Sequence, residues 1–189
     1  MTLTARTVVP QRTLSKVRVL LDALPYMSEH LGRDVVIKAG GAALAEPQLL
    51  DAFANDLAIL RKVGVRPVVV HGGGPQISSL SERLGLRPRF EDGLRVTDAD
   101  TLEVAKMVLV GKLNKDIVGR INRSGVPAVG LCGDDGDLLL ARKRPGPNGR
   151  DLGFVGEITG VNVPLLRKVM EAAVPVIAST ATDEHGQSY

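Results

Sequence analysis

The chain has 189 residues, enough for one well-buried domain, and its 44% hydrophobic and 24% charged residues are typical of a folded globular protein. The chain has 24 cationic and 21 anionic side chains, and aromatic residues make up only 3%. This near balance of charge and the scarcity of aromatic residues argue against a nucleic-acid-binding surface. A single cysteine allows no disulfide within the chain, and no apolar run is long enough to span a membrane. We therefore expect a cytoplasmic protein that binds neither nucleic acid nor membrane.

The first half of the chain alternates between predicted helices and buried strands. After a loose arm over residues 1–12, leucine and valine recur at steps of three and four residues, which predicts a helix over residues 13–31. Pro25 is expected to kink this helix because proline lacks an amide hydrogen. The elements predicted next are a strand at 34–39, a helix at 47–63, a strand at 67–71 and a helix at 75–84 that Gly85 caps.

The second half continues the alternation. A short strand or irregular hairpin at 90–96 precedes a long helix at 98–122, for which Thr97 is the expected N-cap. The remaining predictions are a strand at 128–131, a turn at 133–137, a hairpin of strands 138–141 and 154–158 on the parallel sheet, a helix at 164–172 and a strand at 174–178. This order predicts an α/β fold, a three-layer α/β/α sandwich with a mainly parallel sheet and a hairpin, preceded by an N-terminal helix.

Two glycine-rich loops directly follow buried strands. Gly40 and Gly41 follow the first strand, and Gly72, Gly73 and Gly74 follow the second. Ligands tend to bind at the carboxyl ends of parallel strands, and glycine lets backbone amides approach an anion closely. Neither loop has the spacing of a P-loop or of a dinucleotide fingerprint. Each loop can therefore be a tight turn or a site for a phosphate or carboxylate.

Three cationic or basic side chains lie beside these loops. Lys38 ends the first strand, where it either reaches into solvent or directs its charge at a phosphoryl group. Arg95 stands between a turn and the long helix, as a surface residue or as a bidentate clamp on a carboxylate. For His71 we favour a strand-end histidine with satisfied hydrogen bonds over a general base.

Other polar groups carry weaker signals. Asp134, Asp135 and Asp137 resemble the opening of a calcium loop, but the later ligands are missing, so we expect a solvated turn and no metal site. Cys132 has no histidine nearby in the sequence, and we expect it to be a small buried side chain rather than a catalytic thiol.

Seven strings in the same order carry a family resemblance from about residue 14 onward. They are residues 36–41, 67–77, 92–98, 107–109 together with Asn114 and Lys115, 128–131, 151–157 and 174–178. The strings VVVHGGGPQI and GLRVTD are the most specific. Together they resemble the N-acetylglutamate kinases of the amino-acid kinase superfamily. Two departures are Asp134, which is lysine in many relatives, and Ala39, which is tyrosine or phenylalanine.

The resemblance implies ATP-dependent phosphorylation of the side-chain carboxylate of N-acetyl-L-glutamate, the second step of arginine biosynthesis, with Mg²⁺ accompanying ATP. The acceptor is already ionised at neutral pH, so no general base is needed and a non-catalytic His71 is consistent with the reaction. The roles implied by motif are transition-state stabilisation for Lys38, positions beside the phosphates for Gly40, Gly41 and Gly72, substrate binding through amides for Gly73 and Gly74, and binding of the α-carboxylate for Arg95.

The resemblance also implies a domain organisation. Residues 1–31 form an arm and a kinked helix, and residues 32–189 form the N-acetylglutamate-binding lobe. The ATP-binding C-terminal lobe is absent from this chain, which we expect to be inactive alone. Relatives with such a leading helix resemble arginine-inhibited hexamers, so we expect a homo-oligomer, a dimer or a hexamer through this helix, and L-arginine as a candidate inhibitor.

Two other functions remain open. The first is a non-catalytic module that binds an acidic amino acid or regulates a partner kinase, because the same loop and Arg95 would serve it equally well. The second is a sibling kinase acting on aminoadipate carried by a protein, against which the leading helix and the GLRVTD string argue.

Overall fold

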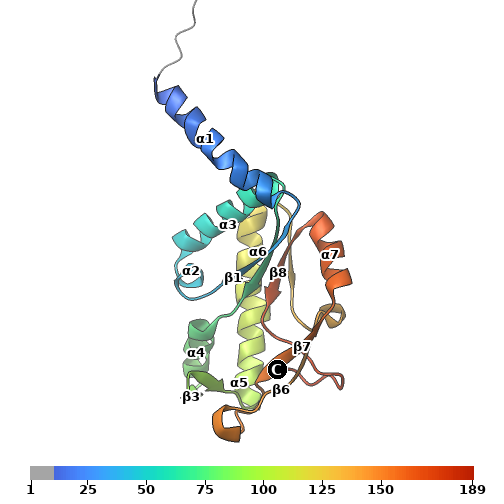
Figure 1. The fold of residues 1–189 in the computed structure, drawn as a ribbon. Helices are drawn as coiled ribbons and strands as arrows, with labels where there is room; N and C mark the ends of the chain where they lie inside the picture. Colours follow the sequence, from blue (N-terminus) through green and yellow to red (C-terminus); the bar gives the residue numbers. More distant parts are fainter. Residues whose placement is uncertain (1–10) are drawn as a thin grey trace, which may run out of the picture.

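The computed structural model describes residues 11–189, and its centre is a four-stranded parallel sheet (Figure 1). Most of the arm expected over 1–12 lies outside the described residues, and its last two residues already belong to the first helix. The strands are β1 (Asp34–Ala39), β2 (Arg66–His71), β5 (Ala128–Leu131) and β8 (Val174–Ala178), in the order β1-β2-β8-β5. All four were predicted from sequence, and the last strand in the chain is inserted between β2 and β5.

Helices cover both faces of this sheet. On one face, α3 (Pro47–Lys62) and α6 (Asn114–Arg123) pack against inward-facing strand residues such as Val69 and Val176. On the other face, α7 (Val163–Ala172) packs against Val68 and Ile177. Fully burying such an aliphatic side chain stabilises the fold by roughly 1.5–3 kcal/mol. The arrangement confirms the predicted three-layer sandwich.

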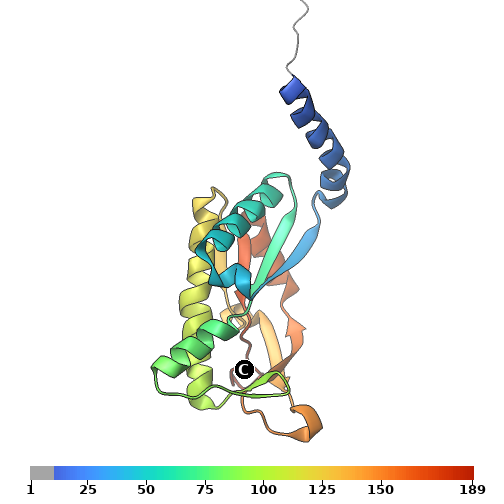
Figure 2. The same ribbon diagram turned by 90° about the vertical axis from the view of Figure 1, so that its left-hand side faces the viewer.

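A smaller group of elements lies beyond the carboxyl ends of the strands (Figures 1 and 2). It contains α2 (Ala42–Ala45), α4 (Gly74–Arg83) and the hairpin of β3 (Arg89–Glu91) with β4 (Leu94–Val96). The long helix predicted at 98–122 consists of α5 (Ala99–Lys106), a π-helical segment η1 (Met107–Leu113) and α6.

Asp98, rather than the expected Thr97, caps the long helix. Its carboxylate accepts a hydrogen bond from Thr101 N at 2.9 Å, which satisfies one of the free amides of the first turn. Thr97 instead donates its hydroxyl to Arg95 O and its amide to Leu152 O. The negative charge of aspartate also suits the positive end of the helix dipole.

The second hairpin is not part of the parallel sheet, which corrects the prediction. The strands β6 (Leu139–Lys143) and β7 (Gly156–Val161) form a separate two-stranded sheet with a bulge between Leu140 and Ala141, and β6 has one further bridge, from Leu140 to Thr182. The return strand begins at 156 rather than 154 because Phe154 N donates to Thr97 O, outside the hairpin. Two 3₁₀ turns, η2 (Asp135–Asp137) and η3 (Pro147–Gly149), complete this region.

Helix α1 (Gln11–His30) projects away from the body of the molecule (Figures 1 and 2). It continues past Pro25, and its apolar residues remain largely exposed; Leu20 and Leu21 are 65% and 58% exposed. No helix within the described residues is both long and apolar enough to span a bilayer.

Candidate functional site

The parallel strands bring four loops together at one edge of the sheet. Ala39 pairs with His71, and His71 pairs with Ala178, so β1, β2 and β8 end at the same level. Backbone hydrogen bonds continue past the strands, from Gly72 N to Ala39 O at 3.4 Å and from Ser179 N to His71 O at 3.1 Å. The two predicted glycine-rich loops are therefore neighbours, as the strand order requires.

The loop after β2 leads directly into α4. Gly73 precedes the helix, contributes no side-chain cap, and accepts the amide of Ile77 at 2.9 Å. A Cβ on Gly73 would overlap Leu113 Cδ1 and come within 2.9 Å of Leu109 Cδ2, so a larger residue here would force these two leucine side chains to shift. The free amides of a helix N-terminus attract anions. The loop can therefore hold a carboxylate or a phosphate.

Arg95 is held against this loop by three contacts. Its Nη2 donates to Gly74 O at 3.0 Å and to Ser78 Oγ at 2.8 Å, and its guanidinium lies 4.7 Å from the centre of the Phe90 ring. Burial lowers the pKa of Arg95 from its ordinary value, but an arginine side chain remains cationic in proteins. Within the described part of the chain, its buried Nη1 has no hydrogen-bond partner. Arg95 thus has a donor left for an anionic ligand.

A cavity of about 580 Å³ lies beside Arg95. Arg95 is the charged side chain among its lining residues, and most of the others are apolar. Representative lining residues are Leu94, Leu109, Phe154, Ile177, Ser179, Thr180 and Tyr189. A pocket with apolar walls and a few polar groups is the usual form of a small-molecule site. Its volume and its single cation suit a small carboxylate ligand.

Both ring nitrogens of His71 contact protein groups. Nδ1 lies 3.1 Å from Gly72 O, and Nε2 lies 3.2 Å from Asn114 Nδ2. The side chain is fully buried, and this burial lowers the pKa of His71 below 6.5. The structure therefore supports the expected histidine with satisfied hydrogen bonds, because neither nitrogen is left to take a proton from a substrate.

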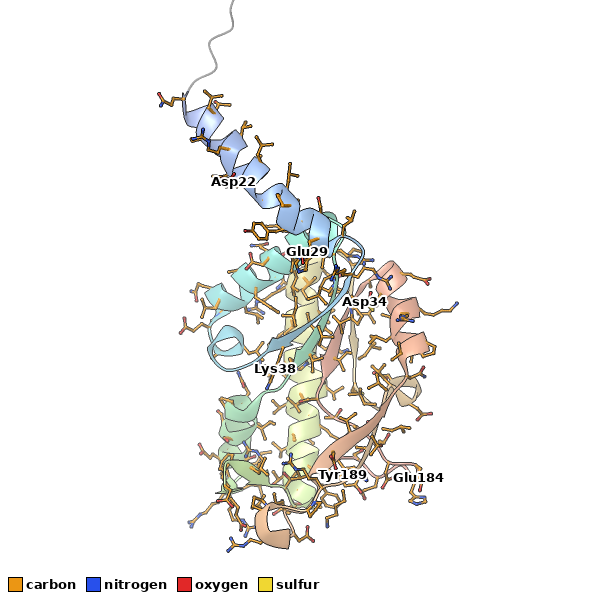
Figure 3. The ribbon with its side chains drawn as sticks, in the orientation of Figure 1. Asp22, Glu29, Asp34, Lys38, Glu184 and Tyr189 are labelled. Carbon is orange, nitrogen blue, oxygen red and sulfur yellow. The ribbon has the colours of Figure 1, made fainter. Side chains whose placement is uncertain are left out.

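The loop after β1 is more open than the loop after β2. Gly41 adopts a positive φ of 57°, and a Cβ on Gly40 or Gly41 would meet no atom within 4 Å. Lys38 is exposed at the end of β1, as Figure 3 shows, and within the described residues it forms no ion pair. Lys38 and these glycines do not line the 580 Å³ cavity. The structure thus brings Arg95 to the second loop and leaves Lys38 on the neighbouring strand.

The acidic turn and the cysteine have structural contacts. Asp134 forms an ion pair with Lys106 at 2.9 Å, and Asp135 accepts the amide of Cys132 at 2.7 Å. Cys132 is buried, and this burial raises the pKa of its thiol. Within residues 11–189, no three histidine, cysteine or acidic side chains converge as a metal site would require.

Sequence reasoning did not select three residues that the structure brings to this edge. Ser179 and Thr180 follow β8 and line the cavity, and Asn114 is fully buried beneath the loop after β2. The insertion of β8 beside β2, which places Ser179 and Thr180 there, cannot be read from local patterns. Asn114 had a usable signal, because a polar residue stands among the apolar positions that mark the buried side of the long helix.

The sequence model of the amino acid kinase family matches residues 34–189. An acetylglutamate kinase of Synechococcus elongatus is 52% identical over 176 residues, which cover 92% of this chain and 57% of that protein. An acetylglutamate kinase of Nostoc punctiforme is 49% identical, covering 96% of this chain and 60% of that protein. The chain thus spans about three fifths of the length of these relatives.

Solved structures agree with the sequence comparison. N-acetylglutamate synthase from Neisseria gonorrhoeae, complexed with coenzyme A and N-acetyl-glutamate, superposes with a TM-score of 0.79 at 26% identity, covering 92% of this chain and 39% of that one. The protein smu.665 from Streptococcus mutans superposes with a TM-score of 0.73 at 26% identity, covering 82% of this chain and 62% of that one.

Proposed function

This chain belongs to the amino acid kinase family, and we propose that it is the part of an acetylglutamate kinase that binds N-acetyl-L-glutamate for phosphorylation by ATP. Its homology to acetylglutamate kinases supports this assignment. The similar synthase structure, which is a complex with coenzyme A and N-acetyl-glutamate, supports it as well. In this proposal, residues 32–189 are the substrate lobe, and the nucleotide is held mainly by a lobe outside this chain.

The observation that carries the proposal is the setting of Arg95. Its guanidinium is fixed by Gly74 O and Ser78 Oγ, its Nη1 lacks a partner among the described residues, and it lines the cavity. Nη2 already gives its two hydrogens to Gly74 O and Ser78 Oγ, so Nη1 is the nitrogen left to donate a charge-assisted hydrogen bond to a carboxylate. We assign the α-carboxylate of N-acetyl-L-glutamate to Arg95, and the rest of the bound substrate to the amides of Gly73 and Gly74.

The reaction places an anion against an anion. A side-chain carboxylate oxygen forms a bond to the γ-phosphorus, the bond between that phosphorus and the ADP oxygen breaks, and ADP leaves. The carboxylate is ionised at neutral pH, so no residue has to remove a proton. Charge stabilisation then does most of the catalytic work. The exposed ammonium of Lys38 is suited to this, with Gly40, Gly41 and Gly72 beside the phosphates.

Mg²⁺ would enter this site with ATP. The described residues offer no cluster of three acidic, histidine or cysteine ligands. Mg²⁺ commonly binds through substrate phosphates and one or two carboxylates, so such a cluster is not needed. When bound, the ion neutralises phosphate charge, and Lys38 and the glycine amides would act alongside it.

Calorimetric titration of the purified chain with N-acetyl-L-glutamate tests the proposal. We expect binding to the wild type and a loss of affinity of about tenfold or more in Arg95→Lys, because the single nitrogen of lysine cannot both hold Gly74 O and Ser78 Oγ and donate to the ligand as Nη2 and Nη1 of arginine do. Arg89→Lys is the matched control, since Arg89 lies on the same hairpin and pairs at 4.0 Å with the exposed Asp98. No binding to a chain shown to be folded would overturn the proposal, as would equal losses in both variants.

Turnover separates the kinase from a purely binding module. The proposal expects acyl-phosphate formation once the chain is joined to the remaining two fifths of a relative such as the Synechococcus elongatus enzyme. Binding of N-acetyl-L-glutamate without turnover in that fusion would instead favour the non-catalytic module.

We also propose that the protein forms a homo-oligomer through α1. The helix projects from the body and exposes Leu14, Leu20 and Leu21 to solvent. Light scattering after size-exclusion chromatography tests this proposal. Deleting residues 1–30 is expected to lower the number of chains per particle. The same number of chains per particle in the full chain and in the deletion variant would contradict the proposal.

A further inference from the structure

We propose that Asn114 and His71 are positioning residues, which hold the loop Gly72–Gly74 in the geometry that binds substrate. The loop conformation itself follows from the contacts below, whereas the consequence for N-acetyl-L-glutamate rests on the proposed function.

The two side chains form a buried chain of hydrogen bonds under the loop. Asn114 Nδ2 lies 2.8 Å from Val176 O and 3.2 Å from His71 Nε2, and His71 Nδ1 lies 3.1 Å from Gly72 O. Both side chains are 0% exposed. This series of hydrogen bonds therefore links α6, through the central strands β8 and β2, to the first residue of the loop. Both side chains thus follow the rule that buried polar groups are hydrogen-bonded.

One arrangement of protons satisfies the contacts of both side chains. The carbonyl oxygens of Gly72 and Val176 can only accept, so His71 Nδ1 and Asn114 Nδ2 must donate to them. The second hydrogen on Asn114 Nδ2 lies between His71 Nε2 at 3.2 Å and Leu131 O at 3.4 Å, and we assign it to the shorter contact, in which Nε2 accepts. His71 is thus neutral and carries its proton on Nδ1. Burial favours the same neutral form.

The π-helical segment places Asn114 at this position. Asn114 directly follows η1 and donates its amide to Leu109 O, a step of five residues. Leu109 and Leu113 of the same segment pack against Gly73. A Cβ on Gly130 would overlap Asn114 Oδ1, so β5 also leaves room for this side chain. Single π-helical turns within α-helices are frequent at functional sites.

Lys115 is a charged residue that contacts the side chain of Asn114. Its Nζ donates to Asn114 Oδ1 at 3.3 Å, which fixes the amide with its nitrogen toward His71. The residues that pair with His71 on the neighbouring strands, Ala39 and Ala178, carry no charge. A second proton on His71 would meet the amide hydrogens of Asn114 and a nearby ammonium, so protonation should release the loop.

Two asparagine variants on the same helix separate positioning from general stability. Asn114→Leu removes the donor to His71, and we expect its affinity for N-acetyl-L-glutamate to fall about tenfold. Asn122→Leu is the matched control, because Asn122 also bonds strand backbone, with Ala128 N at 2.8 Å from its Oδ1, but lies away from the loop. The control should bind as the wild type does. Equal loss of affinity in both variants would overturn the proposal.

Nitrogen NMR of the histidine ring gives a direct readout of the proton arrangement. In the wild type at pH 7 we expect a neutral His71 with its hydrogen on Nδ1. Asn114→Asp keeps the size of the side chain but replaces the donor with an acceptor, so His71 should become doubly protonated at the same pH. A wild-type ring with its hydrogen on Nε2, or an unchanged ring in Asn114→Asp, would overturn the proposal.

Hydrogen exchange keeps this test independent of the substrate. If the wild type fails to bind N-acetyl-L-glutamate, the proposed function fails, but the loop can still be examined. We expect amide exchange at Gly72–Gly74 to speed up about tenfold in Asn114→Leu, which removes the partner of His71 Nε2, and to remain unchanged in Asn122→Leu. Equal exchange at the loop in all three proteins would show that Asn114 and His71 do not hold it.

Discussion

The two glycine-rich loops look alike in sequence but differ in their surroundings. The loop at Gly72–Gly74 lies on a buried support, with Leu109 and Leu113 against Gly73 and His71 bonded to Gly72. The loop at Gly40 and Gly41 has open space at both glycines. A strand followed by glycines therefore identifies an edge where ligands bind, but packing decides whether the loop is preorganised. We infer that the second loop is fixed in advance and that the first can adjust to its ligand.

The largest effect is expected from filling the space at Gly73. Gly73→Ala places a methyl group against two buried leucines, and overpacking of this kind costs about 1–3 kcal/mol. We expect a lower free energy of unfolding in urea and weaker binding of N-acetyl-L-glutamate. Gly40→Ala, the control, meets no atom within 4 Å and should cost nothing. Similar losses in both variants would contradict the contrast between the loops.

Acid should weaken the supported loop through His71. Burial lowers the pKa of His71 below the 6.5 of the unfolded chain, so the unfolded state binds more protons as the pH falls through 6.5. The contribution of neutral His71 to the free energy of unfolding should therefore be fully present above pH 6.5. Below pH 6.5 the free energy of unfolding should decline, by at most about 1.4 kcal/mol per pH unit.

Urea unfolding between pH 7.5 and 5 measures this dependence. The slope should be smaller in His71→Gln, which has no ring to protonate. His185→Gln is the control, because His185 is 81% exposed and should leave the slope as it is in the wild type. An unchanged slope in His71→Gln would show that His71 is not the group responsible.

A smaller effect is expected in the open loop. Gly41 has a positive φ of 57°, which other L-residues adopt at a cost of about 1 kcal/mol. Gly41→Ala should lower the free energy of unfolding by about that amount, from backbone strain alone, because no neighbouring atom obstructs the new methyl group. Chemical denaturation of Gly41→Ala beside Gly40→Ala measures it. A loss above 3 kcal/mol would mean that this loop is also tightly packed.

The smallest effect on stability is expected at Lys38. The side chain is exposed, so Lys38→Met should change the free energy of unfolding by no more than about 0.5 kcal/mol. The same variant, in the fusion with the remaining part of the Synechococcus elongatus relative, should lose most of its turnover while keeping its affinity for N-acetyl-L-glutamate. A stable variant with normal turnover would remove Lys38 from the proposed mechanism.

Sequence patterns were sufficient for the elements of the sheet and for its layers. The strands at 34–39 and 174–178 were predicted with the boundaries that the structure shows, because apolar β-branched runs with adjoining turns are a local signal. The errors arose where tertiary hydrogen bonds decide. Phe154 bonds to Thr97 instead of starting a strand, and Asp98 takes the capping position from Thr97.

The site was only partly predictable for the same reason. Arg95 and the glycine loops were selected from motifs, but their contact through Gly74 O depends on how the hairpin folds back over α4. Ser179 and Thr180 enter the cavity because β8 is inserted beside β2, and Asn114 reaches His71 because of the π-helical segment. These placements depend on residues far apart in the chain, 21 positions for Arg95 and Gly74 and 43 for Asn114 and His71.

Amide hydrogen exchange of the wild-type chain with and without N-acetyl-L-glutamate tests the central claim most directly. We predict that the ligand slows exchange at Gly73 and Gly74, at the amino end of α4, and leaves Gly40 and Gly41 unchanged when ATP is absent. Protection confined to Gly40 and Gly41, or no protection at either loop in a chain that is folded, would contradict the assignment of substrate binding to the supported loop and Arg95.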